Sequence, residues 1–240
     1  MRTIVVTGGA TGIGRAVATA FHTRGDRVVL TGRRAHALTK AVDGLDERAV
    51  PVAFDASDPG QVTAALSQLP DRIDVLVNNA GGNTDFDHDS PADLAEVAAA
   101  WRANLEANLL SAVLVTTALR DRLQTGGAVV NIGSIAADKG AGAYGAAKAG
   151  LASWTVDLAA QLGPTDITVN TLAPGYVADT EFFRDKLSDD IRQTLVDSAL
   201  TQRPSHPEDI AATTEFLASP GARQITGQVL AVNGGERTSR

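Results

Sequence analysis

Cysteine is absent from the 240 residues of this chain. Its absence excludes disulfides, thiolate metal ligands and thiol nucleophiles, and it fits a reducing compartment. Histidine is also scarce, and the four histidines are scattered without the spacing of metal ligands: His22, His36, His88 and His206. We therefore expect no metal site in this protein.

Long apolar runs are absent as well, and a membrane span needs roughly 18 or more consecutive apolar residues. The segment Met1–Thr7 has a single charged residue, and no apolar core of a signal peptide follows it. A net charge of −7 and a pI of about 5 exclude the basic surface that a nucleic acid requires. We expect a cytoplasmic protein whose partner is a small molecule, with neither nucleic acid nor membrane as a partner.

Short apolar runs alternate with helical patterns along the whole chain. The runs are rich in Val and Ile and often apolar at consecutive positions, as in strands that are covered on both faces of a parallel sheet. The predicted strands are Thr3–Val6, Val28–Leu30, Ala49–Phe54, Ile73–Val77, Ala128–Ile132, Ile167–Asn170 and Val229–Val232. The predicted helices span residues 12–24, 34–43, 59–68, 91–123, 142–162 and 183–218, the last one broken.

This alternation predicts one α/β domain over residues 1–240, since the composition shows no linker or break. Right-handed crossovers would give a doubly wound, mostly parallel seven-stranded sheet with helices on both faces, the Rossmann fold. Helix boundaries carry their own signals. Ser90 and Pro91 predict a capping residue and a first helical residue, and Asp58 before Pro59 repeats this arrangement.

Glycines gather where the first predicted strand meets the first predicted helix. Gly8, Gly12 and Gly14 permit a tight turn, and the free N–H groups of the following helix suit a pyrophosphate. The spacing differs from the Gly-x-Gly-x-x-Gly fingerprint, so a plain Gly-rich turn is the alternative. The strand, turn and helix context favours a dinucleotide site, with Thr11 and Ile13 in the same turn.

The second predicted strand ends near Gly32 and Arg33, where an NAD site usually carries an acidic residue. Arginine suits the 2′-phosphate of NADP through charge-assisted hydrogen bonds, so we expect NADP, with NAD as the less favoured cofactor. Asp55 ends the third strand and could accept from an adenine amino group. It could equally be a turn residue before Ser57.

Tyr144 and Lys148 lie four residues apart, one turn along a predicted helix and on the same face. The chain has only 2 Tyr, and its lysines are Lys40, Lys139, Lys148 and Lys186. The pair combines a proton donor with a neighbouring cation. Together with the dinucleotide site, it predicts the transfer of a hydride and a proton to or from a carbonyl.

The order of these motifs resembles that of a protein family. These motifs extend over nearly the whole chain and are, in order, Thr7-Gly8-x3-Gly12-x-Gly14, Asn78-Asn79-Ala80-Gly81, Asn108, Ser134, Tyr144-x3-Lys148 and Pro174-Gly175. The chain resembles the compact, single-domain short-chain dehydrogenases/reductases, in particular enzymes similar to 3-oxoacyl-carrier-protein reductases.

The resemblance implies a role for each polar residue of the site. Tyr144 would be the general acid in reduction, and Lys148 would lower the pKa of the phenol and hold the nicotinamide ribose. Ser134 would polarise the substrate oxygen, with a strand-end cap as the alternative. Asn108 would hold a water that relays protons to Lys148, and by residue type Asn104 and Asn131 compete for that role.

The resemblance also implies which residues bind the dinucleotide: Gly8, Thr11, Gly12, Ile13, Gly14, Arg33, Asp55, Asn79, Ala80, Gly81, Tyr144, Lys148, Pro174, Gly175, Val177 and Thr180. Two features depart from the family's usual pattern. Thr180 stands one position later than is common. Ser134 and Tyr144 are only ten residues apart, so the loop Ile135–Ala143 is shortened, and we expect an altered substrate pocket beside it.

The expected function is NADP-dependent transfer of a hydride between a nicotinamide cofactor and a ketone or secondary alcohol, with ketone reduction favoured. Residues 176–205 would form a substrate lid. The long helices 91–123 and 142–162 would pair between subunits of a homotetramer or homodimer. A redox-sensing or assembly protein without turnover is the alternative outside enzymes, and an epimerase or dehydratase is the alternative within them. No residue identifies the substrate.

Overall fold

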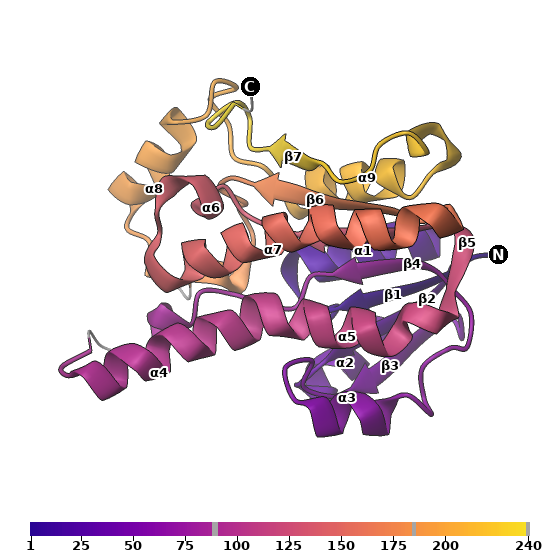
Figure 1. Cartoon of the computed structure of the whole chain (residues 1–240). Coiled ribbons are helices and arrows are strands. Elements are labelled where there is room, and N and C mark those ends of the chain that lie inside the picture. The colour runs from indigo at the N-terminus through magenta and orange to yellow at the C-terminus, as the bar shows by residue number, and fades with distance from the viewer. Residues whose placement is uncertain (88–90, 184–185, 239–240) are drawn as a thin grey trace.

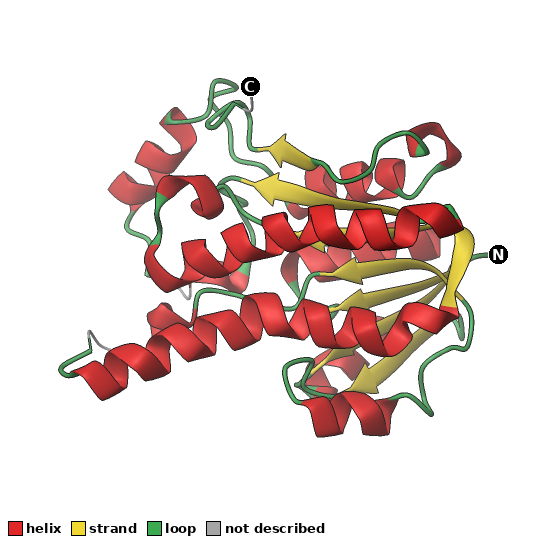
Figure 2. Cartoon of the chain, in the orientation of Figure 1, coloured by secondary structure: helices red, strands yellow, loops and turns green. Residues whose placement is uncertain are grey.

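The computed structural model describes residues 1–87, 91–183 and 186–238, and within them seven strands form one sheet of order β3-β2-β1-β4-β5-β6-β7 (Figures 1 and 2). All the pairings of this sheet are parallel. The strands are β1 (Thr3–Thr7), β2 (Arg27–Gly32), β3 (Ala49–Ala53), β4 (Ile73–Asn78), β5 (Leu123–Ile132), β6 (Thr168–Pro174) and β7 (Val229–Val232). The predicted doubly wound fold is therefore confirmed.

Helices cover both faces of the sheet. They are α1 (Gly12–Thr23), α2 (Ala35–Val42), α3 (Pro59–Ala65), α4 (Leu94–Leu105), α5 (Ser111–Leu119), α6 (Ala136–Lys139), α7 (Gly142–Leu162), α8 (Asp189–Asp197) and α9 (Pro207–Leu217). One core cluster joins the sheet to α1, α2 and α9. The other joins it to α3, α5 and α7. No helix among the described residues is both long and apolar enough to cross a membrane.

The consecutive apolar residues of β1 show why the strands lack polar alternation. Ile4 and Val6 pack into the cluster with α1, α2 and α9. Val5, between them, packs into the cluster on the opposite face. All three side chains are 0% exposed, and each such burial stabilises the fold by about 1.5–3 kcal/mol. A strand covered on both faces needs apolar residues at every position.

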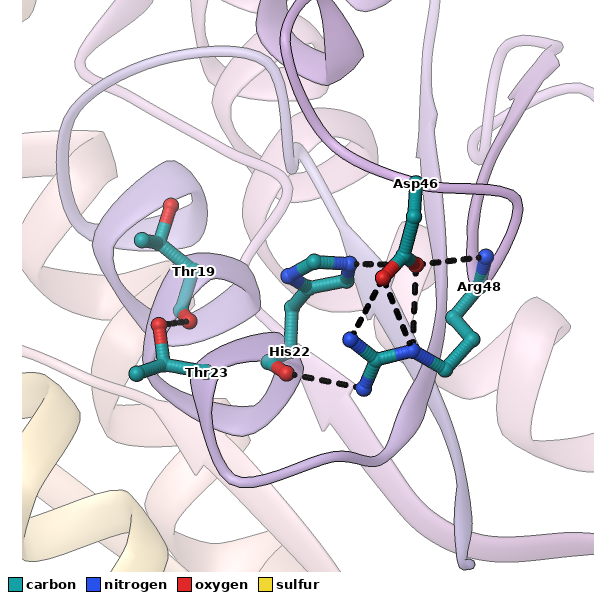
Figure 3. A network of polar contacts seen from close by, with 5 residues as sticks. All are labelled: Thr19, His22, Thr23, Asp46 and Arg48. Carbon is teal, nitrogen blue, oxygen red and sulfur yellow. Dashed lines mark hydrogen bonds and ion pairs between the residues drawn. The ribbon is translucent and has the colours of Figure 1, made fainter.

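A polar network joins the end of α1 to the turn before β3, at the edge of the sheet where the strands begin (Figure 3). The His22 ring lies 2.9 Å from Asp46 Oδ1, and the Arg48 guanidinium donates to the same carboxylate. Arg48 also donates to the His22 carbonyl oxygen at 3.1 Å. The hydrogen bonds from Arg48 and His22 hold the pKa of Asp46 well below its usual range. This cluster stabilises the packing of α1 against the turn before β3, and it lies away from the carboxyl ends of the strands.

The predicted helix 91–123 differs in the structure. Asp93 caps α4, because its carboxylate accepts from the Ala95 and Glu96 amides at 2.8 and 2.9 Å. Helix α4 therefore begins at Leu94, and Ser90 lies outside the described residues. A π-helical turn, Glu106–Leu110, separates α4 from α5, and the segment ends at a 3-10 turn before β5. In Figure 1, α4 extends beyond the sheet, and it packs against α7.

The carboxyl ends of the strands open on the side where α6 and α8 lie (Figure 1). The segment Ile135–Ala143, predicted as a shortened loop, contains the short helix α6. The predicted helix 183–218 is broken as expected. A 3-10 turn (Glu181–Phe183), α8 and α9 take its place. The strand edge and these segments together surround the candidate site.

Candidate functional site

A cleft of about 1030 Å³ lies along the carboxyl ends of the strands. Sixteen of the proposed site residues line it: Gly8, Thr11, Gly12, Ile13, Arg33, Asp55, Asn79, Ala80, Gly81, Ser134, Tyr144, Lys148, Pro174, Gly175, Val177 and Thr180. Gly14 and Asn108 lie behind its lining. One continuous cleft thus joins the glycine turn to the Tyr144 and Lys148 pair, which are far apart in the sequence.

The glycine turn packs too tightly for larger side chains. A Cβ on Gly14 would clash with the Gly8 carbonyl oxygen and with the Asn79 amide. Gly8 has a φ of 63°, which favours glycine. Thr11 precedes the first turn of α1 in an extended conformation, and its side chain makes no capping bond there. Thr11, Gly12 and Ile13 line the cleft at this helix start, and the free amides of a helix start suit an anion.

Thr7 fixes the turn to the end of β4. Its hydroxyl donates to the Val77 carbonyl oxygen at 3.4 Å and accepts from the Asn79 and Ala80 amides, both at 2.9 Å. The side-chain amide of Asn79 donates two hydrogen bonds, to the carbonyl oxygens of Thr7 and Gly8. Asn79 therefore holds the two strand ends together at the centre of the sheet, where strand order reverses and doubly wound folds bind ligands.

Arg33 and Asp55 face each other beyond β2 and β3, with Arg33 Nη1 and Asp55 Oδ2 4.0 Å apart. The Arg33 side chain is exposed and could turn to another anion, since such surface pairs contribute only about 0–1 kcal/mol. Asp55 Oδ1 accepts from the amide and hydroxyl of Ser57, at 2.9 and 2.7 Å. Asp55 thus makes the contacts of a turn residue, while its second oxygen faces the cation and the side chain still lines the cleft; adenine binding by Asp55 stays a prediction.

Ser134, Tyr144 and Lys148 come together at the other end of the cleft. Tyr144 and Lys148 lie on α7, and both are buried, with 7% and 4% of their surfaces exposed. Lys148 Nζ donates to the Ile132 carbonyl oxygen at 2.8 Å and lies 5.9 Å from the centre of the Tyr144 ring. The Ser134 hydroxyl accepts from the Ala136 amide at 3.1 Å, which is the cap expected as its alternative role, and it also hydrogen bonds to Tyr144.

Burial controls the protonation of this pair. It raises the pKa of Tyr144 to about 12, which the hydrogen bond with Ser134 offsets only in part. Burial also lowers the pKa of Lys148 to about 8. Lys148 does not contribute to the Tyr144 pKa in these surroundings, where its ammonium donates to the Ile132 carbonyl oxygen. The lowering of that pKa by Lys148 together with an oxidised nicotinamide stays a prediction.

Asn108 lies at the centre of the π-helical turn, and both its side-chain oxygen and its side-chain nitrogen form hydrogen bonds to backbone groups. Its amide donates to the carbonyl oxygens of Gly82 and Asn104 at 2.9 and 3.0 Å, and its Oδ1 accepts from the Gly82 amide. A Cβ on Gly81 would be 2.5 Å from that oxygen. Asn108 therefore positions the loop after β4 from behind, and π turns often mark such functional positions.

The two rivals of Asn108 have other partners. Asn104 donates to Asp85 Oδ1 at 2.8 Å. Asn131 lies inside the sheet, accepts from Asn78 and donates to Thr155, both at 2.8 Å. Neither lines the cleft. Both are structural in this arrangement.

The segment after β6 crosses the cleft. Val177 and Ser205 form a parallel bridge, and the Ala178 amide donates to the Ser205 carbonyl oxygen at 2.9 Å. The two ends of the predicted lid, residues 176–205, are thus joined at its base. Thr180 lies beside Gly12, so it stands at the glycine turn. The next residue, Glu181, pairs with Arg34 Nη2 at 3.1 Å.

Several cleft residues were not predicted from the sequence. Phe86 follows β4, and its ring packs on Phe182 and Phe183. Glu236 comes from the C-terminal segment, is nearly buried, and forms an ion pair with Lys139 of α6. A lone Phe in a polar loop and a Glu near the C-terminus carry no motif, so only tertiary contacts bring them to the site.

Known proteins resemble this chain in sequence and in fold. A family model described as enoyl-(acyl carrier protein) reductase matches residues 8–236. The cis-4-hydroxycyclohexanecarboxylate dehydrogenase of Sinomonas cyclohexanicum is 37% identical over 98% of this chain and 96% of its own. The 3-oxoacyl-acyl-carrier-protein reductase of Vibrio cholerae is 32% identical over 96% and 95%. A blue fluorescent protein from a metagenomic library, solved with NADPH, superposes with a TM-score of 0.85 at 30% identity, over 99% and 98%.

Proposed function

Because this chain belongs to the short-chain dehydrogenase/reductase family and is a nicotinamide-dependent oxidoreductase, we propose that it uses NADP to reduce a ketone to a secondary alcohol. The observation that carries the proposal is the buried Tyr144 phenol beside Ser134 and Lys148, at the end of the cleft that begins at the glycine turn. The two curated relatives are named for acting on a ketone or on a secondary alcohol, which supports the same reaction class.

The residues present fit a dinucleotide. The turn at Gly8 and Gly14 leaves no room for side chains, so backbone amides at the start of α1 could approach a pyrophosphate closely. Arg33 would hold the 2′-phosphate, because its surface ion pair with Asp55 is weak. Position 32 carries a glycine and not the acidic residue that would repel the phosphate. Thr180 and Val177 would close over the phosphates and the nicotinamide. When bound, the cofactor supplies the hydride.

The chain's own residues would supply the proton. Tyr144 has a pKa of about 12, so at neutral pH the phenol keeps its proton and can donate it to the oxygen of a ketone. Ser134 would orient that oxygen by a hydrogen bond. Lys148, which also lines the cleft, would then return a proton to the Tyr144 phenolate. A raised pKa keeps the proton on the phenol but makes it a weaker acid, so reduction is proposed from the reaction class of the relatives and not from this pKa.

We further propose that the chain is one domain over residues 1–240, with the lid at 176–205, and that it forms a homotetramer or homodimer. The exposed apolar residues of α4 support an oligomer: Leu94, Val97 and Trp101 are 87%, 38% and 46% exposed. Isolated exposed apolar residues are ordinary, but three on one helix that packs beside α7 suit a symmetric interface.

Replacement of Tyr144 by Phe tests the reaction. We expect Tyr144→Phe to lose at least the roughly 10²–10⁴-fold that general acid catalysis contributes, while fluorescence titration shows that NADPH still binds. A redox-sensing protein without turnover is the remaining alternative. It would bind NADPH but show no absorbance change with any ketone, in the parent as in the variant. A variant with near-full ketone reduction would overturn the role of Tyr144.

A further inference from the structure

We propose that Phe86, Phe182 and Phe183 form an aromatic collar over Tyr144 that selects compact cyclic ketones over linear ones. This inference rests on the proposed ketone reduction and names the substrate class that the same site would accept. The collar is defined by these three side chains, and all of them line the cleft.

The collar is a connected set of rings at the catalytic end. Phe182 lies 5.5 Å from the Tyr144 ring, centre to centre, with the ring planes at 57°. Phe182 and Phe183 meet edge to face at 4.9 Å. Phe86 meets them at 5.8 and 5.7 Å. These separations and angles are those of favourable aromatic pairs, so the rings are ordered against one another and against the proposed proton donor.

Two distant segments build the collar. Phe86 belongs to the 3-10 turn Thr84–Asp87 after β4, whereas Phe182 and Phe183 belong to the turn Glu181–Phe183 of the lid. The Lys186 ammonium donates to the Phe86 carbonyl oxygen and ties the two segments together. The lid therefore brings aromatic side chains to the catalytic end whenever it takes this position.

The collar holds a large share of a scarce residue type. Aromatic residues make up 4% of the chain, with 6 Phe in all, and three of these six lie here. All three rings are half-buried rather than sealed into either core cluster. Half-buried rings beside the Tyr144 phenol offer flat apolar surfaces, and a substrate that displaces water from them gains binding energy.

The shape of these surfaces favours a ring over a chain. A six-membered ring adjoining the ketone presents a rigid body of the size of the Phe182 side chain. The three Phe rings contact one another at 4.9–5.8 Å, so a substrate ring would pack on their exposed faces and not between them. A linear chain of equal carbon number must freeze its rotatable bonds to fit the same space, which costs binding energy.

Substrate pairs of equal carbon number test the proposal. We would measure kcat/KM with NADPH for cyclohexanone against 2-hexanone, and for acetophenone against 2-octanone. In the parent the cyclic ketone should be preferred by about tenfold or more, the discrimination that apolar pockets reach. Phe182→Leu and Phe183→Leu should bring the ratio close to one, whereas Phe182→Tyr, which keeps the ring, should retain it.

Phe216→Leu is the matched control, because Phe216 is an exposed Phe of α9 outside the cleft, and it should leave the ratio unchanged. If Phe182 and Phe183 only pack the lid on the body, the Leu variants will lower both members of each pair equally, and the collar proposal is overturned. A parent without cyclic preference overturns it as well.

A failure of the proposed function can be distinguished from a failure of the collar proposal, because in that case no ketone oxidises NADPH even with the parent protein. The collar would still be tested by binding, through the rise in melting temperature that cyclohexanol and 1-hexanol each produce. A larger rise with cyclohexanol that Phe182→Leu abolishes would support the collar. Equal rises would overturn it.

Discussion

Replacing Lys148 by Met should change the pH dependence of stability. Lys148 is 4% exposed, its ammonium has the Ile132 carbonyl oxygen as its hydrogen-bond acceptor, and among the described residues no salt bridge involves it. A buried cation without a carboxylate destabilises the folded state. Met is unbranched and similar in length, so Lys148→Met removes the charge with little change in packing.

The magnitude follows from the pKa of Lys148, which burial lowers from 10.5 to about 8. At about 1.4 kcal/mol for each pKa unit, the charged form costs the fold roughly 3 kcal/mol at neutral pH. The folded state binds fewer protons than the unfolded state between pH 8 and 10.5. The free energy of unfolding of the parent therefore rises through that window, and the cost is fully present below pH 8.

The variant lacks this rise but loses the hydrogen bond to the Ile132 carbonyl oxygen, which costs about 1–3 kcal/mol at every pH. At pH 7 Lys148→Met should thus be as stable as the parent, or more stable by up to about 2 kcal/mol. At pH 10 it should be the less stable protein. The raised pKa of Tyr144 acts in both proteins, so it cancels in their difference.

Urea unfolding at fixed protein concentration, from pH 7 to pH 10, measures this difference. We expect the free energies of the parent and of Lys148→Met to diverge by about 2–3 kcal/mol over that range, while the variant has lost ketone reduction. Lys40→Met is the matched control, because Lys40 is exposed on α2, and its curve should run parallel to that of the parent. Parallel curves for Lys148→Met would refute the buried, destabilising charge.

Two further predictions concern the cofactor and the assembly. Gly32→Asp with Arg33→Ala should lower the ratio of kcat/KM for NADPH over NADH by about tenfold or more, because a charge-assisted hydrogen bond to the 2′-phosphate is lost and a repulsive carboxylate is gained. A parent that prefers NADH would contradict the role of Arg33. Light scattering should show a dimer or tetramer for the parent, and Trp101→Asp, on the exposed face of α4, should shift it toward the 24.8 kDa monomer. A parent that is already monomeric at micromolar concentration would exclude the proposed interface.

The strands were the best predicted part of the chain, because parallel strands covered on both faces show as runs of Val and Ile. Their ends were less visible. Strand β6 continues to Pro174 through Thr171 and the small Ala173, which lack the apolar signal of Val169. Strand β5 begins at Leu123, before Gly126 and Gly127, which look like a break in the sequence. Pairing with neighbouring strands, and not local composition, sets these limits.

The candidate site could be predicted where a motif carries it. The glycines and the spacing of Tyr144 and Lys148 identify a cofactor end and a chemical end, and the fold joins them in one cleft. The rise in the Tyr144 pKa could not be predicted, since it comes from residues that bury the phenol. The role of Phe86 in the cleft could not be predicted either, because its partners Phe182 and Phe183 are nearly a hundred residues away in the sequence.

Burial acts on both members of the catalytic pair in the same sense. It raises the pKa of Tyr144 and lowers that of Lys148, because the charged form of each loses its water. A phenol with a raised pKa keeps its proton at neutral pH, but it is also a weaker acid, so burial by itself selects neither reduction nor oxidation. Efficient proton transfer would need the Tyr144 pKa to fall when a cofactor and a substrate bind beside it. The removal of water from α7 where it meets the cleft thus weakens the fold at Lys148 and makes the acidity of Tyr144 depend on what binds in the cleft.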